Sequence, residues 1–347
     1  MKGYQKMAIQ KSVLSEPEIC KLLEKNYGIS ADKVQRLPLG TANCFKVFAK
    51  DKAFFLKEYQ KTFSEQDLQR EIALNKFLLS QSFPTAGFMK DKNGNTYHFI
   101  NDRYVVLQEY IDGESYVNHD LSDNMLFQAA EILGQLHEIL REYDLPVDMN
   151  SIWVKEFNVS QAYKSYDFLL NQAEKVEDKS IRNKISKDLI FKKELLEHME
   201  PYGQYFDKIT YKSTHGDYSA MQYLCAGDRI KAIIDFASAK KIPAVWEIMR
   251  SYMQSAKDTN DPFHFDIAKF CEFVRHYMNF SSLTEWDLKY MPFVYLYQLG
   301  RSRYGYKEYI TNAENKDELL KFAFWRTDVC RMLLNQADEL SKRLTEL

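Results

Sequence analysis

Apolar and polar positions alternate along the first third of the chain as in short strands, whereas the remainder follows the spacing of helices. Residues 45–48 and 53–56 are short apolar runs on either side of a polar turn, which predicts a β-hairpin. A further strand is expected at 104–108. Apolar residues recur every three or four positions over 124–141, and similar spacing continues to the end of the chain. A β-type stretch near 210–240 interrupts this helical part. Because a β-rich first third precedes a mainly helical remainder, we predict an α+β protein.

Two helices are predicted within the first third. Ser15 and Glu18 have the spacing of a capping box, and Gly28 is a suitable stop for the helix that follows. Residues 64–80 return to the helical period. The buried stripe expected for this second helix is Leu68, Ile72, Phe77 and Leu78.

Composition narrows the class of protein. The 347 residues are 45% apolar and 14% aromatic, which excludes a disordered chain, and no apolar run approaches the roughly 20 residues that a membrane span needs. Lys and Arg number 47 against 49 Asp and Glu, so a basic surface for nucleic acid or anionic membranes is not expected. Five widely spaced cysteines and a start without a secretory pattern favour a cytoplasmic protein. A monomer and a homodimer both stay open.

The candidate chemistry lies in the β-type stretch. Asp217 and Asp235 are separated by what reads as a hairpin, and Gln222 comes five residues after Asp217. Phosphoryl transfer uses one carboxylate to orient or deprotonate the acceptor hydroxyl, and a second carboxylate with an amide oxygen to hold Mg²⁺ against the nucleotide phosphates. A His-Gly-Asp triplet alone is usually an ordinary turn. The order of loop, strand, turn and strand is expected to bring all three groups to one edge.

These residues resemble the signature of a known family. His-Gly-Asp at 215–217, an amide five residues later and Ile-Asp-Phe at 234–236 are similar to the pattern of the aminoglycoside phosphotransferase-like small-molecule kinases, which include choline kinase, homoserine kinase of the second type and CotS-like spore-coat proteins. The resemblance implies a two-lobed protein-kinase-like fold with a β-rich N-lobe and a mainly helical C-lobe. It also implies that Asp217 is the catalytic base, that His215 braces its loop and that Asp235 binds Mg²⁺.

The chain departs from the family pattern at two positions. Gln222 stands where the family has Asn, and Ala237 stands where many relatives have a second acidic residue. Gln keeps the amide carbonyl but is longer by one methylene, and Mg²⁺ tolerates little distortion. An alternative is therefore a catalytically weak kinase-like binding protein or a structural protein of the spore-coat type.

A kinase-like fold also requires nucleotide-binding parts upstream. Gly40 and Asn43 resemble the family's phosphate loop, Lys57 lies among apolar residues of the next predicted strand, and Glu71 follows on the helix that would fix this lysine. Each signal is weak alone, and their order is what supports the resemblance. The predicted contacts to the base of ATP or GTP come from the strand that links the lobes: Gln108, Glu109, Tyr110 and Ile111.

The resemblance thus predicts a nucleotide-binding lobe over 1–112 and, over 113–347, a lobe with the catalytic loop and the acceptor-binding helices. Glu247 and Arg250 either brace the catalytic loop or form an ordinary ion pair. The helix that ends near His137 matches the pattern after the linker strand, and this histidine is expected to be structural.

The sequence does not identify the acceptor molecule. An aminoglycoside, an amino alcohol, a sugar and a homoserine-like compound all carry a suitable hydroxyl. A cationic acceptor would suit a group of carboxylates, whereas an anionic acceptor would suit a basic group, and aromatic side chains nearby could hold a sugar or belong to the core. The acidic candidates are Asp258, Asp261 and Asp266, and the basic ones are Arg301, Arg303 and Lys307.

Overall fold

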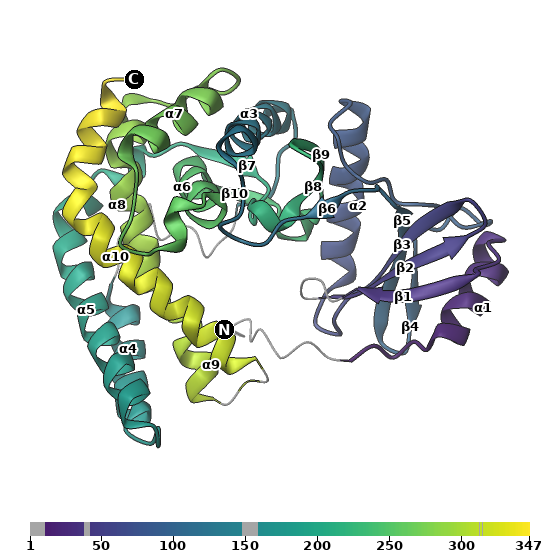
Figure 1. The fold of residues 1–347 in the computed structure, drawn as a ribbon, viewed down its shortest axis with the longest axis horizontal. Coiled ribbons are helices and arrows are strands. Elements are labelled where there is room, and N and C mark those ends of the chain that lie inside the picture. Colours follow the sequence, from purple (N-terminus) through teal and green to yellow (C-terminus); the bar gives the residue numbers. More distant parts are fainter. Residues whose placement is uncertain (1–10, 38–41, 148–158, 312, 314) are drawn as a thin grey trace. The chain divides into compact units, whose positions relative to one another are not determined.

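The chain divides into two compact units, each with its own set of elements (Figure 1). The first unit comprises Met1–Ser115 and Gln222–Ser238, and the second comprises Tyr116–Met221 and Ala239–Leu347. This grouping places the hairpin at 222–238 with the first unit, whereas the sequence-based boundary falls once, after residue 112. The computed structural model describes residues 11–37, 42–147, 159–311, 313 and 315–347.

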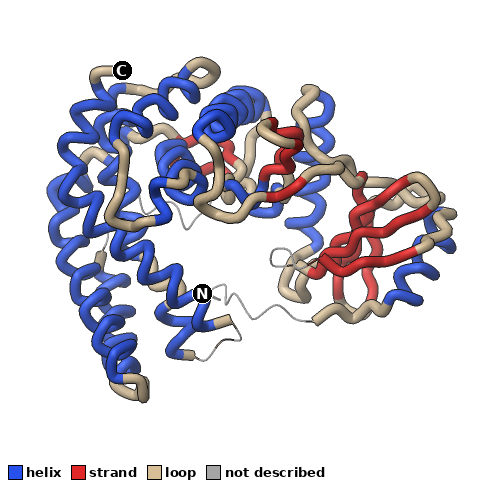
Figure 2. The backbone as a smooth tube through the Cα atoms, in the orientation of Figure 1, coloured by secondary structure: helices blue, strands red, loops and turns tan. Residues whose placement is uncertain are grey.

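The first unit is built on an antiparallel sheet of five strands in the order β1-β2-β3-β5-β4 (Figure 2). A second sheet has the order β6-β8-β9, so the hairpin after residue 221 pairs with a strand of the first segment. The strands of this unit are β1 (Lys33–Leu37), β2 (Asn43–Ala49), β3 (Lys52–Glu58), β4 (Tyr97–Ile100), β5 (Arg103–Glu109), β6 (Glu114–Ser115), β8 (Tyr223–Ala226) and β9 (Arg229–Ile233).

Local signals set the two helices of the first unit. In α1 (Glu16–Tyr27), the backbone N–H of Ser15 donates to Glu18 at 2.8 Å, and Gly28 ends the helix with a φ of 70°, a conformation that glycine adopts without strain. In α2 (Glu65–Ser80), the hydroxyl of Ser64 accepts from the first turn. Both helices begin where the sequence predicted.

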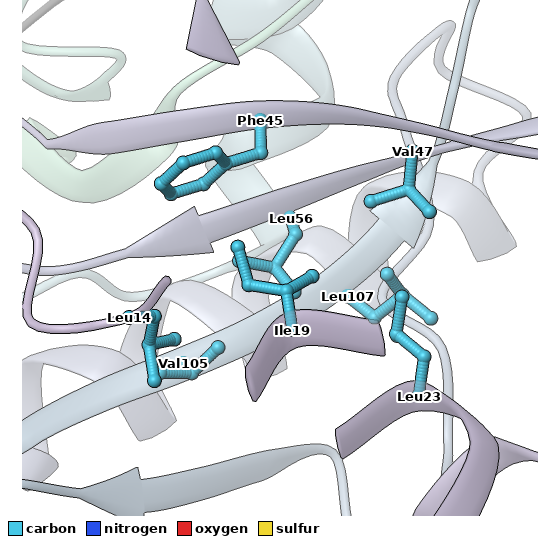
Figure 3. Packing of buried hydrophobic residues seen from close by; sticks show 8 residues of the cluster. All are labelled: Leu14, Ile19, Leu23, Phe45, Val47, Leu56, Val105 and Leu107. Atoms are coloured by element: carbon cyan, nitrogen blue, oxygen red, sulfur yellow. The ribbon is translucent and has the colours of Figure 1, made fainter. Parts of the chain in front are cut away.

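The core of the first unit lies between α1 and the five-stranded sheet (Figure 3). Ile19 and Leu23 project from α1 and are fully buried, and they pack with inward-facing residues of β2, β3 and β5. Full burial of such a side chain contributes about 1.5–3 kcal/mol relative to exposure. The cluster is completed by Leu14, Phe45, Val47, Leu56, Val105 and Leu107.

The buried face of α2 differs from the predicted stripe. Leu68 and Leu78 are buried as expected, but Ile72 and Phe77 are half-buried. Glu71 and Asn75 are among the residues that take inner positions, because both have polar partners inside the unit.

The second unit is mainly helical and contains one small antiparallel sheet of β7 (Tyr211–Thr214) and β10 (Lys240–Pro243). The helical expectation for 155–176 lies partly outside the described residues, and the described helix begins at Ser160. No helix within the described ranges has the length and apolarity to cross a membrane. The helices are α3 (Asp123–Ile139), α4 (Ser160–Ala173), α5 (Lys179–Gly203), α6 (Ala244–Ser255), α7 (Ile267–Met278), α8 (Glu285–Arg301), α9 (Tyr306–Ile310) and α10 (Lys316–Thr345).

Candidate active site

Three of the predicted nucleotide and metal residues meet inside the first unit. Lys57 of β3 is buried, and its Nζ lies 2.8 Å from Oδ1 of Asp235 and 3.6 Å from Oε1 of Glu71. Glu71 faces inward from α2, and the hydroxyl of Tyr59 donates to its second oxygen at 2.8 Å. The ion pair that the sequence predicted between Lys57 and Glu71 is therefore present, and Asp235 joins it.

Burial and charge act against each other in this cluster. Burial disfavours the charged form of Lys57, but Asp235 and Glu71 outweigh it and hold the lysine pKa well above its usual range. Burial raises the pKa of Glu71, while Lys57 acts in the opposite direction. The lysine thus stays an ammonium ion, which is the form that can bind phosphate oxygens.

Asp235 lies at the base of the β8–β9 hairpin in a strained conformation. Its φ is 65°, in the left-handed region that costs an ordinary residue about 1–2 kcal/mol. The preceding residue, Ile234, donates its N–H to the carbonyl of Gln222 at 3.0 Å, so the hairpin brings Gln222 and Asp235 to the same end. Strain of this kind persists where the surrounding structure fixes the residue and often marks functional sites.

Part of the strand predicted to contact the nucleotide base is paired with neighbouring segments of the sheet. The N–H of Glu109 donates to the carbonyl of Gly87 at 2.9 Å, and Gln108 pairs with Phe55 of β3. Tyr110 and Ile111 follow the last residue of β5, beyond this ladder. They are the better placed of the four predicted contacts.

The predicted phosphate loop can be described only in part. Gly40 lies outside the described residues. Asn43 is buried at the start of β2, where its amide donates to Glu58 at 3.3 Å and accepts from Arg36 at 3.1 Å. The Asn43 side chain therefore has a structural role in the sheet, and its contact with phosphates stays a prediction.

In the second unit, Glu247 of α6 braces the His-Gly-Asp loop. Its carboxylate accepts the backbone N–H groups of His215, at 3.1 Å, and Gly216. The N–H of Asp217 donates to Nδ1 of the buried His215 at 3.2 Å, which fixes the loop from within. His215 thus occupies the bracing position that the sequence predicted.

Arg250, one turn after Glu247 on α6, fixes the carboxylate of Asp217 itself. Its Nη2 pairs with Oδ1 of Asp217, and its Nη1 donates to the carbonyl of Tyr218 at 3.4 Å. The Asp217 side chain is 40% exposed, so a bound molecule can reach it. The contacts of Glu247 and Arg250 confirm the bracing interpretation.

His137 completes this support from α3. Its Nε2 lies 2.9 Å from Oε2 of Glu247, and its Nδ1 lies 2.8 Å from the hydroxyl of Tyr277. Burial would raise the pKa of Glu247, but hydrogen bonds from His137 and the loop outweigh it and lower the pKa. Burial lowers the pKa of His137 despite its hydrogen bond to Glu247. The sequence predicted a structural histidine but gave no sign of its link to the His-Gly-Asp loop.

Each acidic candidate for a cationic acceptor has a structural partner. Asp258 accepts from Tyr252 at 3.1 Å and lies 3.5 Å from Lys269. Asp266 caps α7, and Asp261 accepts the N–H of Phe263 within its own loop. The aromatic side chains of Tyr295, Tyr297 and Tyr306, in the C-terminal third of the chain, belong to the buried core.

A hollow of about 560 Å³ is found elsewhere in the second unit, between α5 and α10. Lys184 and Arg331 line it, and both pair with Asp328. Because none of the predicted site residues lines this hollow, we do not assign the reaction to it.

The chain belongs to the phosphotransferase enzyme family (APH), whose sequence profile it matches over residues 33–269. Hydroxylysine kinase of Mus musculus is 25% identical over 164 residues, which are 42% of this chain and 43% of the mouse protein. The match therefore spans less than half of this curated relative. Family membership and the kinase relative indicate a small-molecule kinase, in agreement with the sequence prediction.

Solved structures share the fold. Spectinomycin phosphotransferase in complex with ADP and spectinomycin has a TM-score of 0.69 at 16% identity, with 95% of this chain and 100% of that chain covered. Amicoumacin kinase in complex with AMP-PNP and Ca²⁺ has a TM-score of 0.62 at 12% identity, covering 92% and 94%. A microcompartment-associated aminopropanol kinase has a TM-score of 0.64 at 14% identity, covering 95% and 100%. The predicted family and the two-lobed, kinase-like α+β fold are confirmed.

Proposed function

We propose that this protein transfers the γ-phosphoryl group of ATP or GTP to a hydroxyl group of a small molecule. The observation that carries the proposal is the meeting of Lys57, Glu71 and Asp235, which are far apart in sequence and were each expected for this chemistry. Lys57 would bind the nucleotide phosphates, and Glu71 would hold it in place. Tyr110 and Ile111 would contact the base.

Mg²⁺ is the metal that this chemistry implies, and the donors at the hairpin base fit it. Gln222 and Asp235 offer an amide and a carboxylate oxygen, which are hard ligands, and the Asp235 side chain is 36% exposed. Mg²⁺ in nucleotide sites is usually held by one or two protein ligands together with water and the substrate phosphates, so two donors are enough. When bound, the ion neutralises charge on the transferring phosphates.

Asp217 would orient the acceptor hydroxyl and take its proton as the bond to phosphorus forms. Arg250 fixes the rotation of this carboxylate, while Glu247 and His215 fix the loop that carries it. Alignment of this kind contributes a large part of the rate in phosphoryl transfer, since no covalent enzyme intermediate is required.

The acceptor would be an aminoglycoside, an amino alcohol, a sugar or a hydroxy amino acid. The name of the mouse relative adds hydroxylysine to this panel. We place the reaction in the cytoplasm, with the enzyme as a monomer or homodimer.

The direct test compares the parent with Asp217→Asn in an acceptor-dependent phosphorylation assay and in nucleotide binding by thermal shift. We expect turnover to fall by about 10³-fold or more, with the Mg²⁺-dependent shift by ATP or GTP retained. Asp144→Asn is the control, because this side chain is 90% exposed. Equal turnover in parent and Asp217→Asn would refute the assignment of the base.

The same assays separate the enzyme from the alternative that Gln222 raised. A nucleotide shift that requires Mg²⁺, together with turnover, supports the kinase. Binding without turnover in the parent, with turnover gained by Gln222→Asn, would support a catalytically weak binding protein. The absence of any nucleotide shift would favour a structural role.

A further inference from the structure

Arg326 of α10 is a cation without a counter-ion in the described part of the second unit. Its Nη2 donates to the carbonyl of Tyr304 at 2.7 Å, and its guanidinium carbon lies 4.9 Å from the ring centroid of Phe322. No carboxylate among the described residues pairs with it within 4.0 Å, and its buried Nε has no acceptor there. Arg326 is half-buried, and a buried donor without an acceptor is costly unless a further partner binds it.

Another arginine on the same helix shows the contrast. Arg331 pairs with Asp188 at 2.8 Å and with Asp328 at 2.7 Å. Burial disfavours its charge, but Asp188 and Asp328 outweigh the burial and raise its pKa. For Arg326, burial lowers the pKa, and the groups that oppose this change are the phenols of Tyr306, Tyr295 and Tyr304 and the thiol of Cys330. Among the described residues, Arg331 therefore has two carboxylate partners, whereas Arg326 on the same helix has none.

The surroundings of Arg326 connect it with the catalytic loop of the same unit. Trp246, one turn before Arg250 on α6, packs on Tyr295 with ring centroids 5.1 Å apart. Burial raises the pKa of Tyr295, and the charges of Arg250 and Arg326 both oppose this rise. The guanidinium carbon of Arg326 lies 5.5 Å from the ring centroid of Tyr304. Burial raises the pKa of Tyr304, the carboxylates of Glu308 and Asp217 add to the rise, and Arg326 opposes it. Arg326 and Asp217 thus both influence the phenol of Tyr304.

The charges near this loop suit an anionic group better than a cationic one. The acidic candidates Asp258, Asp261 and Asp266 are engaged in an ion pair, a loop and a helix cap. A guanidinium group is planar and can donate two parallel hydrogen bonds to one carboxylate. The guanidinium carbon of Arg326 lies over the ring of Phe322, 4.9 Å from its centroid.

We propose that Arg326 binds a carboxylate of the acceptor, so that the substrates are small alcohols that also carry a carboxylate group, hydroxy amino acids included. This proposal rests on the proposed kinase function and names its substrate class. Arg326 is a specificity residue, because Asp217 performs the proton transfer.

The experiment uses matched acceptors that differ by the carboxylate alone. Serine is paired with ethanolamine, homoserine with 3-amino-1-propanol, and 5-hydroxylysine with 1,5-diaminopentan-2-ol. We expect kcat/KM to be at least about tenfold higher for a carboxylate-bearing member than for its partner. In Arg326→Gln, we expect kcat/KM for the carboxylate-bearing acceptor to fall by about 10- to 100-fold, mainly because KM rises. This is the size expected for the loss of a charged hydrogen bond, and kcat/KM for the acceptor without a carboxylate should change little.

Two variants separate recognition from structure. Arg326→Lys keeps the charge without the planar fork, so it should retain part of the carboxylate preference. Arg343→Gln is the control, since Arg343 is exposed in the last turn of the same helix. If Arg326→Gln does not fold, the parent's acceptor preference and the lysine variant decide the question.

The outcomes distinguish this inference from the function on which it rests. Phosphorylation of the decarboxylated partners in preference, or an equal loss for both members of each pair in Arg326→Gln, overturns the inference and leaves the kinase intact. The absence of both a Mg²⁺-dependent nucleotide shift and phosphorylation of any acceptor, aminoglycosides included, overturns both proposals.

Discussion

Nζ of Lys57 lies 2.8 Å from Oδ1 of Asp235, although 178 residues separate them in the sequence. Asp235 lies in the hairpin at 222–238, which belongs to the same compact unit as Lys57. Glu71 is the second carboxylate on this lysine, and both Lys57 and Glu71 are more than 90% buried. Removing one member leaves an uncompensated charge in the interior, which is the costly state for a buried pair.

Lys57→Met should therefore destabilise the protein by about 3 kcal/mol, because Glu71 loses its nearest cation. Lys57→Met with Glu71→Gln should recover part of this loss, since the second change removes the unpaired charge. Urea denaturation of the parent, both single variants and the double variant measures the coupling.

Lys61→Met is the control for this cycle, because Lys61 pairs with Asp102 at an exposed site where both side chains are at least 60% exposed. Its effect should stay within about 0.5 kcal/mol. Additive losses in the double variant at Lys57 and Glu71 would show that the two side chains do not stabilise each other.

Glu247→Gln should slow turnover without weakening nucleotide binding. The glutamine amide has one acceptor oxygen, so it cannot accept both loop N–H groups as well as the hydrogen bond from His137. The loop that carries Asp217 would then lose a fixed orientation. We expect kcat to fall by about 10²-fold while the nucleotide KM changes less than threefold.

Steady-state kinetics at varied nucleotide concentration check this split. Glu272→Gln is the matched control, because Glu272 is 44% exposed and pairs with Arg275 on the surface of α7. A rise in nucleotide KM with an unchanged kcat would contradict a positioning role for Glu247.

The link between His137 and Glu247 also predicts the response to acid. The pKa of His137 is lowered from 6.5, chiefly by burial, so below about pH 6.5 the unfolded chain binds a proton that the folded protein does not. The free energy of unfolding should therefore decrease as the pH falls below 6.5. Because the pKa of Glu247 is also lowered in the folded protein, the free energy of unfolding should decrease further below pH 4.5.

His137→Gln should reduce this dependence between pH 6.5 and 5. Urea denaturation at several pH values measures the slope, and His264→Gln, at an exposed position, is the control. An unchanged slope in His137→Gln would show that this histidine is protonated in the folded protein.

Much of the fold could be predicted because its signals are local. The capping box at Ser15, the turn between β2 and β3 and the helical spacing of 64–80 depend on residues a few positions apart. Lys57 was identifiable in the same way, from its place in an alternating strand.

Other features could not be predicted because they depend on distant partners. Asn75 is buried instead of Phe77 because its amide donates to the carbonyl of Ala86 at 2.9 Å, a contact that hydrophobic spacing does not encode. His137 and Glu247 are 110 residues apart. The roles of the acidic residues near 260 could not be predicted for a related reason. Asp can cap a helix or bind a ligand, and only its partners in the folded structure distinguish the two roles.

Lys192 of α5 is a buried amine outside the proposed site, and it gives the last prediction. Its Nζ donates to the carbonyls of Leu299 at 2.6 Å and Ser302 at 2.9 Å, at the end of α8. Burial lowers its pKa to about 7. A neutral amine has two N–H donors, which match these two carbonyls.

Between pH 7 and 10.5 the unfolded chain therefore binds a proton at Lys192 that the folded protein lacks. Its contribution to the free energy of unfolding should rise with pH by at most about 1.4 kcal/mol per pH unit. Urea denaturation at pH 7, 8 and 9 should show this rise in the parent and a flatter dependence in Lys192→Met. Lys187→Met is the control, since Lys187 is exposed on the same helix and should leave the slope unchanged. A slope in Lys192→Met equal to that of the parent would mean that the buried lysine keeps its proton on folding.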